Sequence, residues 1–258
     1  MVDAKTQIRT YYRALYSAWG RQHWWPAHSP FEVIVGAYLT QNTSWTNVEK
    51  ALDSLRQAGR LSVSGIRRTS QKKLERLIRS AGYFRQKAHR LKTFVRFLDE
   101  RYGGSLARMF AQPTAQLREE LLALHGVGPE TADSILLYGG NHPVFVVDAY
   151  TRRILERHGI IQTKTNYEEI RRLFEDALAP LAAEENQKQR EEGSTDRVTG
   201  PTGSCHPPSR ISETGRSPLA QVFNEMHGLF VGVGKNYCQK SQMRCEQCPL
   251  QKFLPEKS

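Results

Sequence analysis

The chain has 258 residues, enough for one large domain or two modest ones with hydrophobic cores. Lysine and arginine total 37 against 26 aspartates and glutamates, and the resulting net charge of +11 favours a polyanionic partner, either nucleic acid or an anionic membrane surface. No apolar run approaches the roughly 20 residues that span a bilayer, and residues 1–10 lack the apolar segment of a signal peptide. These features exclude a membrane-spanning or secreted protein, so we expect a cytoplasmic one.

Apolar residues recur at helical spacing through the first half of the chain. The pattern predicts helices over 5–20, from Pro30 to the polar run 40–43, from about Ser44, around 63–66, over 71–80, over 85–102 and over 106–112.

The second half continues in the same way, with one extended apolar run at 144–147. Because this run is the one convincing strand-like segment, the predicted fold class is all-α. The expected helices lie at 117–124, from 129 to about 136, from 149 to about 158, over 167–181 and over 219–233.

Residues 184–218 interrupt the helical order. The segment is rich in glycine, proline, serine and charge and almost free of large apolar side chains. Such a composition cannot bury enough surface to offset the entropy lost on ordering, so we interpret it as a disordered insertion. One of the four cysteines, Cys205, lies inside it.

The stretch 117–153 combines two features of chemical interest. A helix breaks at Gly126-Val127-Gly128 and restarts at Pro129, a residue suited to the first helical position. The turn exposes backbone N–H groups at a helix N-terminus, which is a ready site for a phosphate. The apolar run that follows delivers a lone acid, Asp148, directly before the next helix. This carboxylate is a candidate catalytic group.

These motifs resemble a known family. The run G-V-G-P-E-T-A from Gly126, followed by V-F-V-V and Asp148, is similar to the helix-hairpin-helix DNA glycosylases of the endonuclease III superfamily. The spacing of Cys238, Cys245 and Cys248 resembles the iron–sulfur loop of that superfamily. The resemblance covers about 31–254 without the insertion.

Further runs are most similar to the 3-methyladenine DNA glycosylase III branch. They are Leu39-Thr-Gln-Asn-Thr, Gly82-Tyr-Phe-Arg-Gln-Lys-Ala, Glu130-Thr-Ala-Asp-Ser-Ile-Leu and Trp24-Trp25-Pro26.

The resemblance implies a two-lobed helical protein. A six-helix barrel at 29–145 carries the hairpin, and residues 1–28 and 146–258 form the second lobe with the cysteine loop. Double-stranded DNA containing a damaged base would bind across the cleft between the lobes. The protein would act as a monomer in base excision repair, in the cytoplasm at a bacterial nucleoid.

Two acids bear on the reaction. Asp148 matches the catalytic aspartate of the superfamily, where a carboxylate stabilises a cationic sugar or activates water; it is also a normal helix N-cap. In bifunctional members a lysine two residues after the second hairpin glycine forms a Schiff base, and Glu130 stands there instead. Glu130 also suits a first helical turn. Its presence favours a monofunctional enzyme, although Lys235 or Lys87 could supply the amine.

The resemblance also places residues on DNA. Gly126, Val127 and Gly128 would hold the DNA backbone through main-chain N–H groups, without reading sequence; the alternative is a purely structural turn. Gln41 and Tyr83 match positions that fill the gap left by an extruded base, or they are ordinary loop residues.

Tryptophans and basic side chains complete this set. Trp24, Trp25 and Trp45 are candidates for a pocket that holds the extruded base, where a cationic alkylated purine gains about 0.5–2 kcal/mol per aromatic contact. The alternative is that they belong to the core. Lys235, with Lys240 and Arg244, would contact phosphate or form a solvated basic face.

The cysteine loop departs from the family pattern. Its last ligand would fall at position 254, which is Leu254, so three thiolates remain and Cys205 is a distant possible fourth. A [4Fe–4S] cluster with an unusual ligand, a degraded site and a loop kept for packing are all compatible with the sequence.

Taken together, the sequence predicts a DNA glycosylase that removes damaged bases, with alkylated purines as the favoured substrates. One alternative is an endonuclease III-like glycosylase/lyase for oxidised pyrimidines. A second is a catalytically silent helix-hairpin-helix module that only binds DNA.

Overall fold

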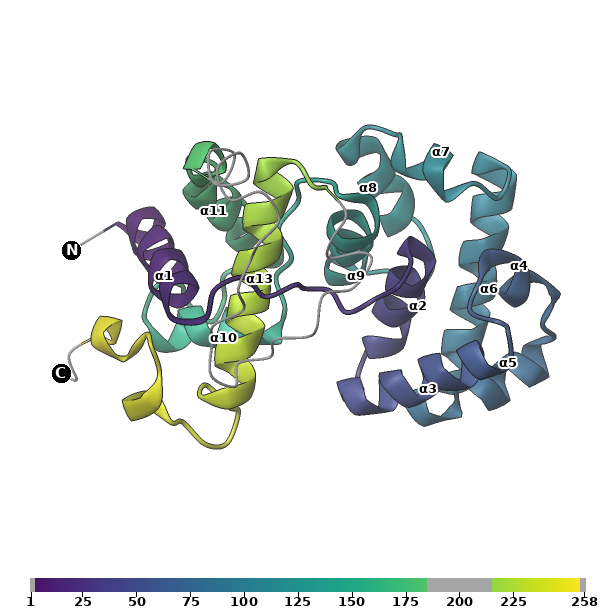
Figure 1. The fold of residues 1–258 in the computed structure, drawn as a ribbon, viewed down its shortest axis with the longest axis horizontal. Helices are drawn as coiled ribbons and strands as arrows, with labels where there is room; N and C mark the ends of the chain where they lie inside the picture. Colours follow the sequence, from purple (N-terminus) through teal and green to yellow (C-terminus); the bar gives the residue numbers. More distant parts are fainter. Residues whose placement is uncertain (1–2, 185–214, 256–258) are drawn as a thin grey trace. The chain divides into compact units, whose positions relative to one another are not determined.

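The structure is a computed structural model that describes residues 3–184 and 215–255. In these ranges helices and loops follow one another, with no β-strand and a single isolated bridge between Cys238 and Met243 (Figure 1). The predicted all-α class is confirmed, and residues 144–147 are extended without strand pairing. None of the helices in the described ranges has the length and apolar character needed to cross a bilayer.

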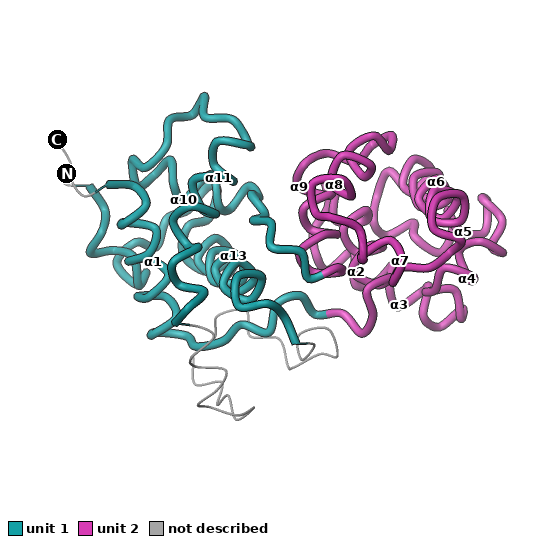
Figure 2. Tube along the Cα trace, turned by 90° about the horizontal axis from the view of Figure 1, so that it is seen from above, with its two compact units in different colours: residues 1–26, 141–258 teal, residues 27–140 magenta. Residues whose placement is uncertain are grey.

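The chain divides into two compact units (Figure 2). Unit 2 is the continuous segment 27–140, whereas unit 1 combines residues 1–26 with residues 141–258. Unit 1 is therefore discontinuous in sequence, and the hairpin and Asp148 belong to different units.

Unit 2 is organised around α2 (Pro30–Thr40), in which every residue from Phe31 to Leu39 is buried. The side chain of Ser29 caps this helix by accepting the N–H of Glu32, and a proline at the first position pre-sets the backbone. The other elements of the unit are α3 (Trp45–Gln57), α4 (Val63–Arg68), α5 (Gln71–Leu77), η1 (Arg79–Ala81), α6 (Phe84–Tyr102), α7 (Leu106–Phe110), α8 (Thr114–Leu122), α9 (Pro129–Ser134) and η2 (Ile135–Gly139).

Unit 1 is organised around α13 (Pro218–Asn236), which is buried without interruption from Ala220 to Gly234. Helices α1 (Ala4–Trp19), α10 (Ala149–Arg157) and α11 (Tyr167–Leu178) pack against it. A Cβ at Gly234 would lie 2.2 Å from Tyr150 Cδ1, so the close approach of α10 requires glycine here. The unit closes with two short turns, η3 (Cys245–Gln247) and η4 (Gln251–Phe253).

The predicted insertion at 184–218 falls mostly outside the described residues, as does Cys205. Its last residues are described and correct the expected boundary. The side chain of Arg216 is buried, and Ser217 caps α13 by accepting the N–H of Ala220 at 3.3 Å. The helix thus starts at Pro218, one residue before the predicted start, because proline is well suited to a first helical position.

Candidate active site

Asp148 is the N-cap of α10. Its Oδ1 accepts the backbone N–H of Thr151 at 2.7 Å, so the helix-capping role proposed from the sequence is confirmed. The other oxygen, Oδ2, lies 3.6 Å from Nε2 of His227 on α13. The Asp148 side chain is only 13% exposed and that of His227 only 4%.

Two opposing effects set the pKa of Asp148. Burial raises the pKa of the carboxyl, whereas the adjacent imidazole of His227 and the contacts with Thr151 lower it. The lowering effects win, and the pKa lies below its ordinary value. Asp148 is therefore ionised at neutral pH in a place where few water molecules screen its charge.

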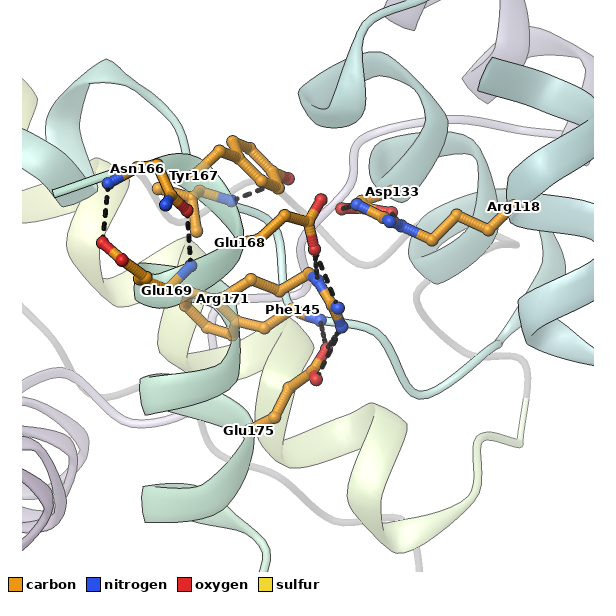
Figure 3. Close-up of polar contacts among 10 residues, drawn as sticks. Arg118, Asp133, Phe145, Asn166, Tyr167, Glu168, Glu169, Arg171 and Glu175 are labelled. Carbon is orange, nitrogen blue, oxygen red and sulfur yellow. Dashed lines mark hydrogen bonds and ion pairs between the residues drawn. The ribbon is translucent and has the colours of Figure 1, made fainter. Parts of the chain in front are cut away.

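The extended run that leads to Asp148 is fixed by side chains of α11 (Figure 3). The N–H of Phe145 donates to Oε1 of Glu175 at 3.0 Å, and the N–H of Val147 donates to the hydroxyl of Tyr167 at 3.3 Å. Arg171 binds the same Glu175 carboxylate at 2.7 Å. These contacts satisfy backbone groups that would pair in a sheet, which explains how a strand-like sequence stays extended alone.

Two aromatic rings lie near the ring of His227. The centroid of its ring lies 6.2 Å from that of Trp24 and 6.4 Å from that of Phe145. Trp24 packs edge-on against Trp25 at 5.5 Å, and each is 5% exposed. The ammonium of Lys235 lies 5.7 Å from the Trp24 ring centroid. Unit 1 thus gathers Trp24, His227, Lys235 and Asp148, four side chains from three parts of the chain.

The hairpin in unit 2 joins α8 to α9 through residues 123–128. Gly126 has a φ of +81°, and a Cβ there would lie 2.1 Å from Nε of Arg90. The Gln41 amide donates to the carbonyl of Gly126 at 3.1 Å and to Oγ1 of Thr131 at 3.0 Å, and its oxygen accepts from Arg90. Gln41 and Arg90 therefore brace the turn from inside the unit.

Gly128 differs from Gly126. Its φ is −95°, and a Cβ built on it would meet nothing within 4 Å. Among the described residues no contact requires glycine at position 128, and the residue is exposed at the start of α9. Val127 is buried below it, and Glu130 is exposed in the first helical turn, where the helix dipole favours an acid.

Two further candidate residues of unit 2 have contrasting environments. Tyr83 is 66% exposed and adopts a left-handed conformation, with φ of 43°, immediately before α6. Trp45 is the first residue of α3 and is half-buried. Tyr83 is therefore an exposed aromatic side chain on a tight turn.

Arginines of α10 hold the cysteine loop of unit 1. Arg153 donates to the carbonyl of Cys238 at 2.7 Å, and Arg157 donates to the carbonyl of Gln239 at 2.8 Å and to Sγ of Cys238 at 3.2 Å. Burial, together with nearby Cys238 and Cys245, raises the pKa of the Cys248 thiol to about 11, against a smaller opposing effect from the N–H of Leu250.

The donor set does not complete a four-cysteine site. Leu254 offers no donor where the family's last ligand would fall, and Cys205 lies outside the described residues. In residues 3–184 and 215–255, no three cysteine, histidine or acidic side chains are gathered so as to hold a metal. The described residues therefore do not fit a [4Fe–4S] cluster bound by four cysteines.

His227 and Arg90 were not among the candidates named from the sequence. His227 stands in a helix whose neighbours are mostly apolar and reads as a core residue. Arg90 is one of many basic residues on α6. The bond between Arg90 and Gln41 and the pairing of His227 with Asp148 join residues 49 or more positions apart, so the local pattern carries no signal for them.

Comparison with known proteins agrees with this arrangement of helices and hairpin. A family described as "HhH-GPD superfamily base excision DNA repair protein" matches residues 35–180. The chain is 38% identical over 248 residues to the Methanocaldococcus jannaschii protein named "Putative DNA repair glycosylase MJ1434", covering 95% of this chain and 94% of the relative. It is 35% identical over 221 residues to endonuclease III of Thermotoga maritima, covering 86% and 80%.

The structure of Helicobacter pylori 3-methyladenine DNA glycosylase (MagIII) bound to 1,N6-ethenoadenine is also similar. The TM-score is 0.68 at 27% identity, covering 91% of this chain and 98% of that one. Fold and sequence define an all-α helix-hairpin-helix protein. The chain belongs to the HhH-GPD superfamily of base excision DNA repair proteins, and it is a DNA glycosylase.

The bracing of the hairpin gives a testable contrast. We expect Gly126→Ala to lower the free energy of unfolding by about 1–3 kcal/mol, because the new Cβ meets Arg90 and the backbone is left-handed. Gly128→Ala is the matched control and should change it by less than about 0.5 kcal/mol. Urea denaturation of both variants measures the difference, and equal effects would contradict this account of the hairpin.

Proposed function

We propose that this glycosylase hydrolyses the N-glycosidic bond of alkylated purines in double-stranded DNA and leaves the abasic site uncut. The observation that carries the proposal is Asp148, an ionised carboxylate at a helix N-terminus beside a histidine whose ring lies near that of Trp24. The similar H. pylori structure supports the substrate class, since that protein is named as a 3-methyladenine glycosylase.

Asp148 would act on the sugar. Breaking the glycosidic bond leaves positive charge on the deoxyribose, and a carboxylate held in a poorly solvated place stabilises that charge more strongly than one in water. The lowered pKa of Asp148 keeps the charge in place at neutral pH. The same carboxylate can orient the attacking water, which ends the reaction as hydrolysis.

The absence of a lysine at the hairpin position supports a monofunctional reaction. Glu130 cannot form an imine with the sugar. Lys87 has a pKa lowered to about 8 by burial and by Arg90, which would suit a nucleophile. However, its ammonium is buried and donates to the carbonyls of Leu39 at 2.9 Å and Ala81 at 2.7 Å, so we assign it a structural role. Lys235 beside Trp24 remains the candidate amine for a lyase.

We propose that Trp24 lies at the face of the base pocket. Its contact with Lys235 is a cation–π interaction, and an alkylated purine carries a positive charge that the same kind of ring attracts. Trp25 would support Trp24 from behind, given the edge-on packing of the two rings. Trp45 stays a pocket prediction for unit 2.

The DNA backbone would be held by the N–H groups of the hairpin. Open space around Gly128 supports this, because a phosphate needs room that a side chain would fill. Tyr83 is exposed enough to enter the duplex where a base is extruded, and Gln41 would act beside the hairpin that it braces. Lys235 is the proposed basic contact of unit 1. We further propose a monomer that works in the cytoplasm.

Asp148→Asn tests the catalytic assignment. We expect it to slow the release of 3-methyladenine from a duplex by at least about 100-fold, because the carboxylate charge is lost. Folding should persist, since asparagine caps helices as well as aspartate does. Single-turnover assays measure the rate of base release, and DNA-binding titrations show whether the variant still folds and binds DNA. Asp176→Asn removes an exposed charge of the same unit and serves as control; full activity in Asp148→Asn would reject the mechanism.

Borohydride trapping tests the reaction type. With abasic duplex DNA, we expect no covalent complex, because no amine is placed at the hairpin position. A trapped complex that disappears in Lys235→Met but persists in Lys87→Met would instead establish a lyase that uses Lys235. That result would favour a bifunctional enzyme like endonuclease III, the name of the T. maritima relative.

The cysteine loop calls for a separate proposal. We propose that Arg153 and Arg157 hold it without a four-cysteine cluster, given their contacts with residues 238–240. Anaerobically purified protein should then lack the broad visible absorption of a [4Fe–4S] cluster, and iron analysis should give far fewer than four atoms per chain. Stoichiometric iron that is lost in Cys238→Ala would show that three thiolates and another ligand suffice.

A further inference from the structure

We propose that His227 is a positioning residue for Asp148, and that its protonation state controls how much of the carboxylate charge acts on the sugar. The inference rests on the proposed role of Asp148. It adds His227 to the site and makes the rate depend on the charge of its ring.

The geometry divides the two oxygens of Asp148 between two partners. Oδ1 is committed to the N–H of Thr151 at 2.7 Å, which fixes the carboxyl group at the start of α10. Oδ2 is then the oxygen left to act on a substrate, and Nε2 of His227 lies 3.6 Å from it. This distance is too long for a good hydrogen bond but short enough for a strong ion pair when the imidazole is protonated.

The imidazole is held in place from several directions. His227 lies within the buried stretch of α13, and its ring lies edge-on to Phe145 and tilted against Trp24. Phe145 in turn is stacked on Phe174 with centroids 4.2 Å apart. Since the ring belongs to a rigid helix and contacts the run that delivers Asp148, it cannot follow the carboxylate freely. The position of the ring is therefore fixed, and only its charge can change.

Protonation of His227 has a predictable effect on the reaction. A protonated imidazole places positive charge next to Oδ2 and offsets the carboxylate just where positive charge develops on the sugar. A neutral imidazole leaves the full negative charge available, while the N–H of Thr151 still fixes the carboxyl group through Oδ1. Base release should therefore be faster with neutral His227, and histidine normally titrates in the range where this matters.

Other charged groups of unit 1 have partners of their own. On α13, Glu225 binds the N–H of Gln22 and the amide of Gln221, and Lys235 lies over Trp24. On α10, Arg153 is bonded to the carbonyl of Cys238 and the pKa of Tyr150 is raised by burial and by Asp148. On α11, Glu175 pairs with Arg171.

The buried histidine of α10, His158, contacts Tyr11 on α1. The pKa of Asp148 itself lies below its ordinary value, because the contacts with His227 and Thr151 outweigh the effect of burial. Nε2 of His227 lies 3.6 Å from Oδ2, so a change in the charge of its ring acts directly on that oxygen.

The first experiment is a pH profile of single-turnover base release from a 3-methyladenine duplex, with enzyme in excess. In the unmodified protein the rate should fall by up to tenfold per pH unit below the pKa of His227. His227→Gln keeps a polar side chain that cannot ionise, so its profile should be flat from pH 5 to 8. His89→Gln, at an exposed position of α6, should keep the acidic limb. An acidic limb that persists in His227→Gln would overturn the proposal, since a histidine kept only for packing would not alter the profile.

The second experiment does not depend on activity. NMR titration of the His227 ring in the unmodified protein and in Asp148→Asn should give different titration curves, because a nearby carboxylate favours the charged ring. Equal pKa values would overturn the pairing. If the pKa differs but no alkylated purine is released from DNA, the pairing stands and the proposed substrate class fails.

Discussion

A carboxylate removed from water normally takes up a proton, because its hydration is lost and nothing replaces it. Asp148 is mostly buried and yet has a lowered pKa, so the surrounding protein must supply what water would have supplied. The supply comes from the first turn of α10 and from the imidazole on α13. Both groups reach Asp148 only if α10 and α13 pack closely. This close packing requires glycine at position 234, which leaves room for the side chain of Tyr150.

The segment before Asp148 also contains buried polar groups, the backbone N–H groups of residues 144–147, which need hydrogen-bond partners. Four apolar residues in extended form would expose unsatisfied backbone groups in the core, and α11 resolves this with Glu175 and Tyr167. Arg171 offsets the charge that Glu175 brings with it. An aspartate can thus be presented at a fixed point without a sheet, and its carboxyl group is not free to drift toward solvent.

The sequence was informative wherever a residue acts through its neighbours in the chain. Helical periodicity located nearly every helix, and the position of Asp148 before Ala149 predicted the capping bond that the structure contains. The sequence predicts the start of α13 one residue late, because Pro218 resembles the polar segment before it. The bonds of Gln41 with the hairpin and the pairing of His227 with Asp148 could not be predicted, since each joins residues far apart in the sequence. For the same reason, Lys87 could be a nucleophile on sequence grounds, and only its two carbonyl partners argue against that.

The bracing of the hairpin also bears on how this protein can change over evolutionary time. Arg90 fills the space that a side chain at position 126 would need, and it also holds the amide of Gln41. A substitution at any of these three positions alters the surroundings of the other two, so neutral drift at one of them is restricted until a compensating change occurs. Position 128 is not part of this group, since nothing in unit 2 fills the space beside it. A constraint on position 128 would have to come from outside the unit, whereas position 126 is constrained by its own fold.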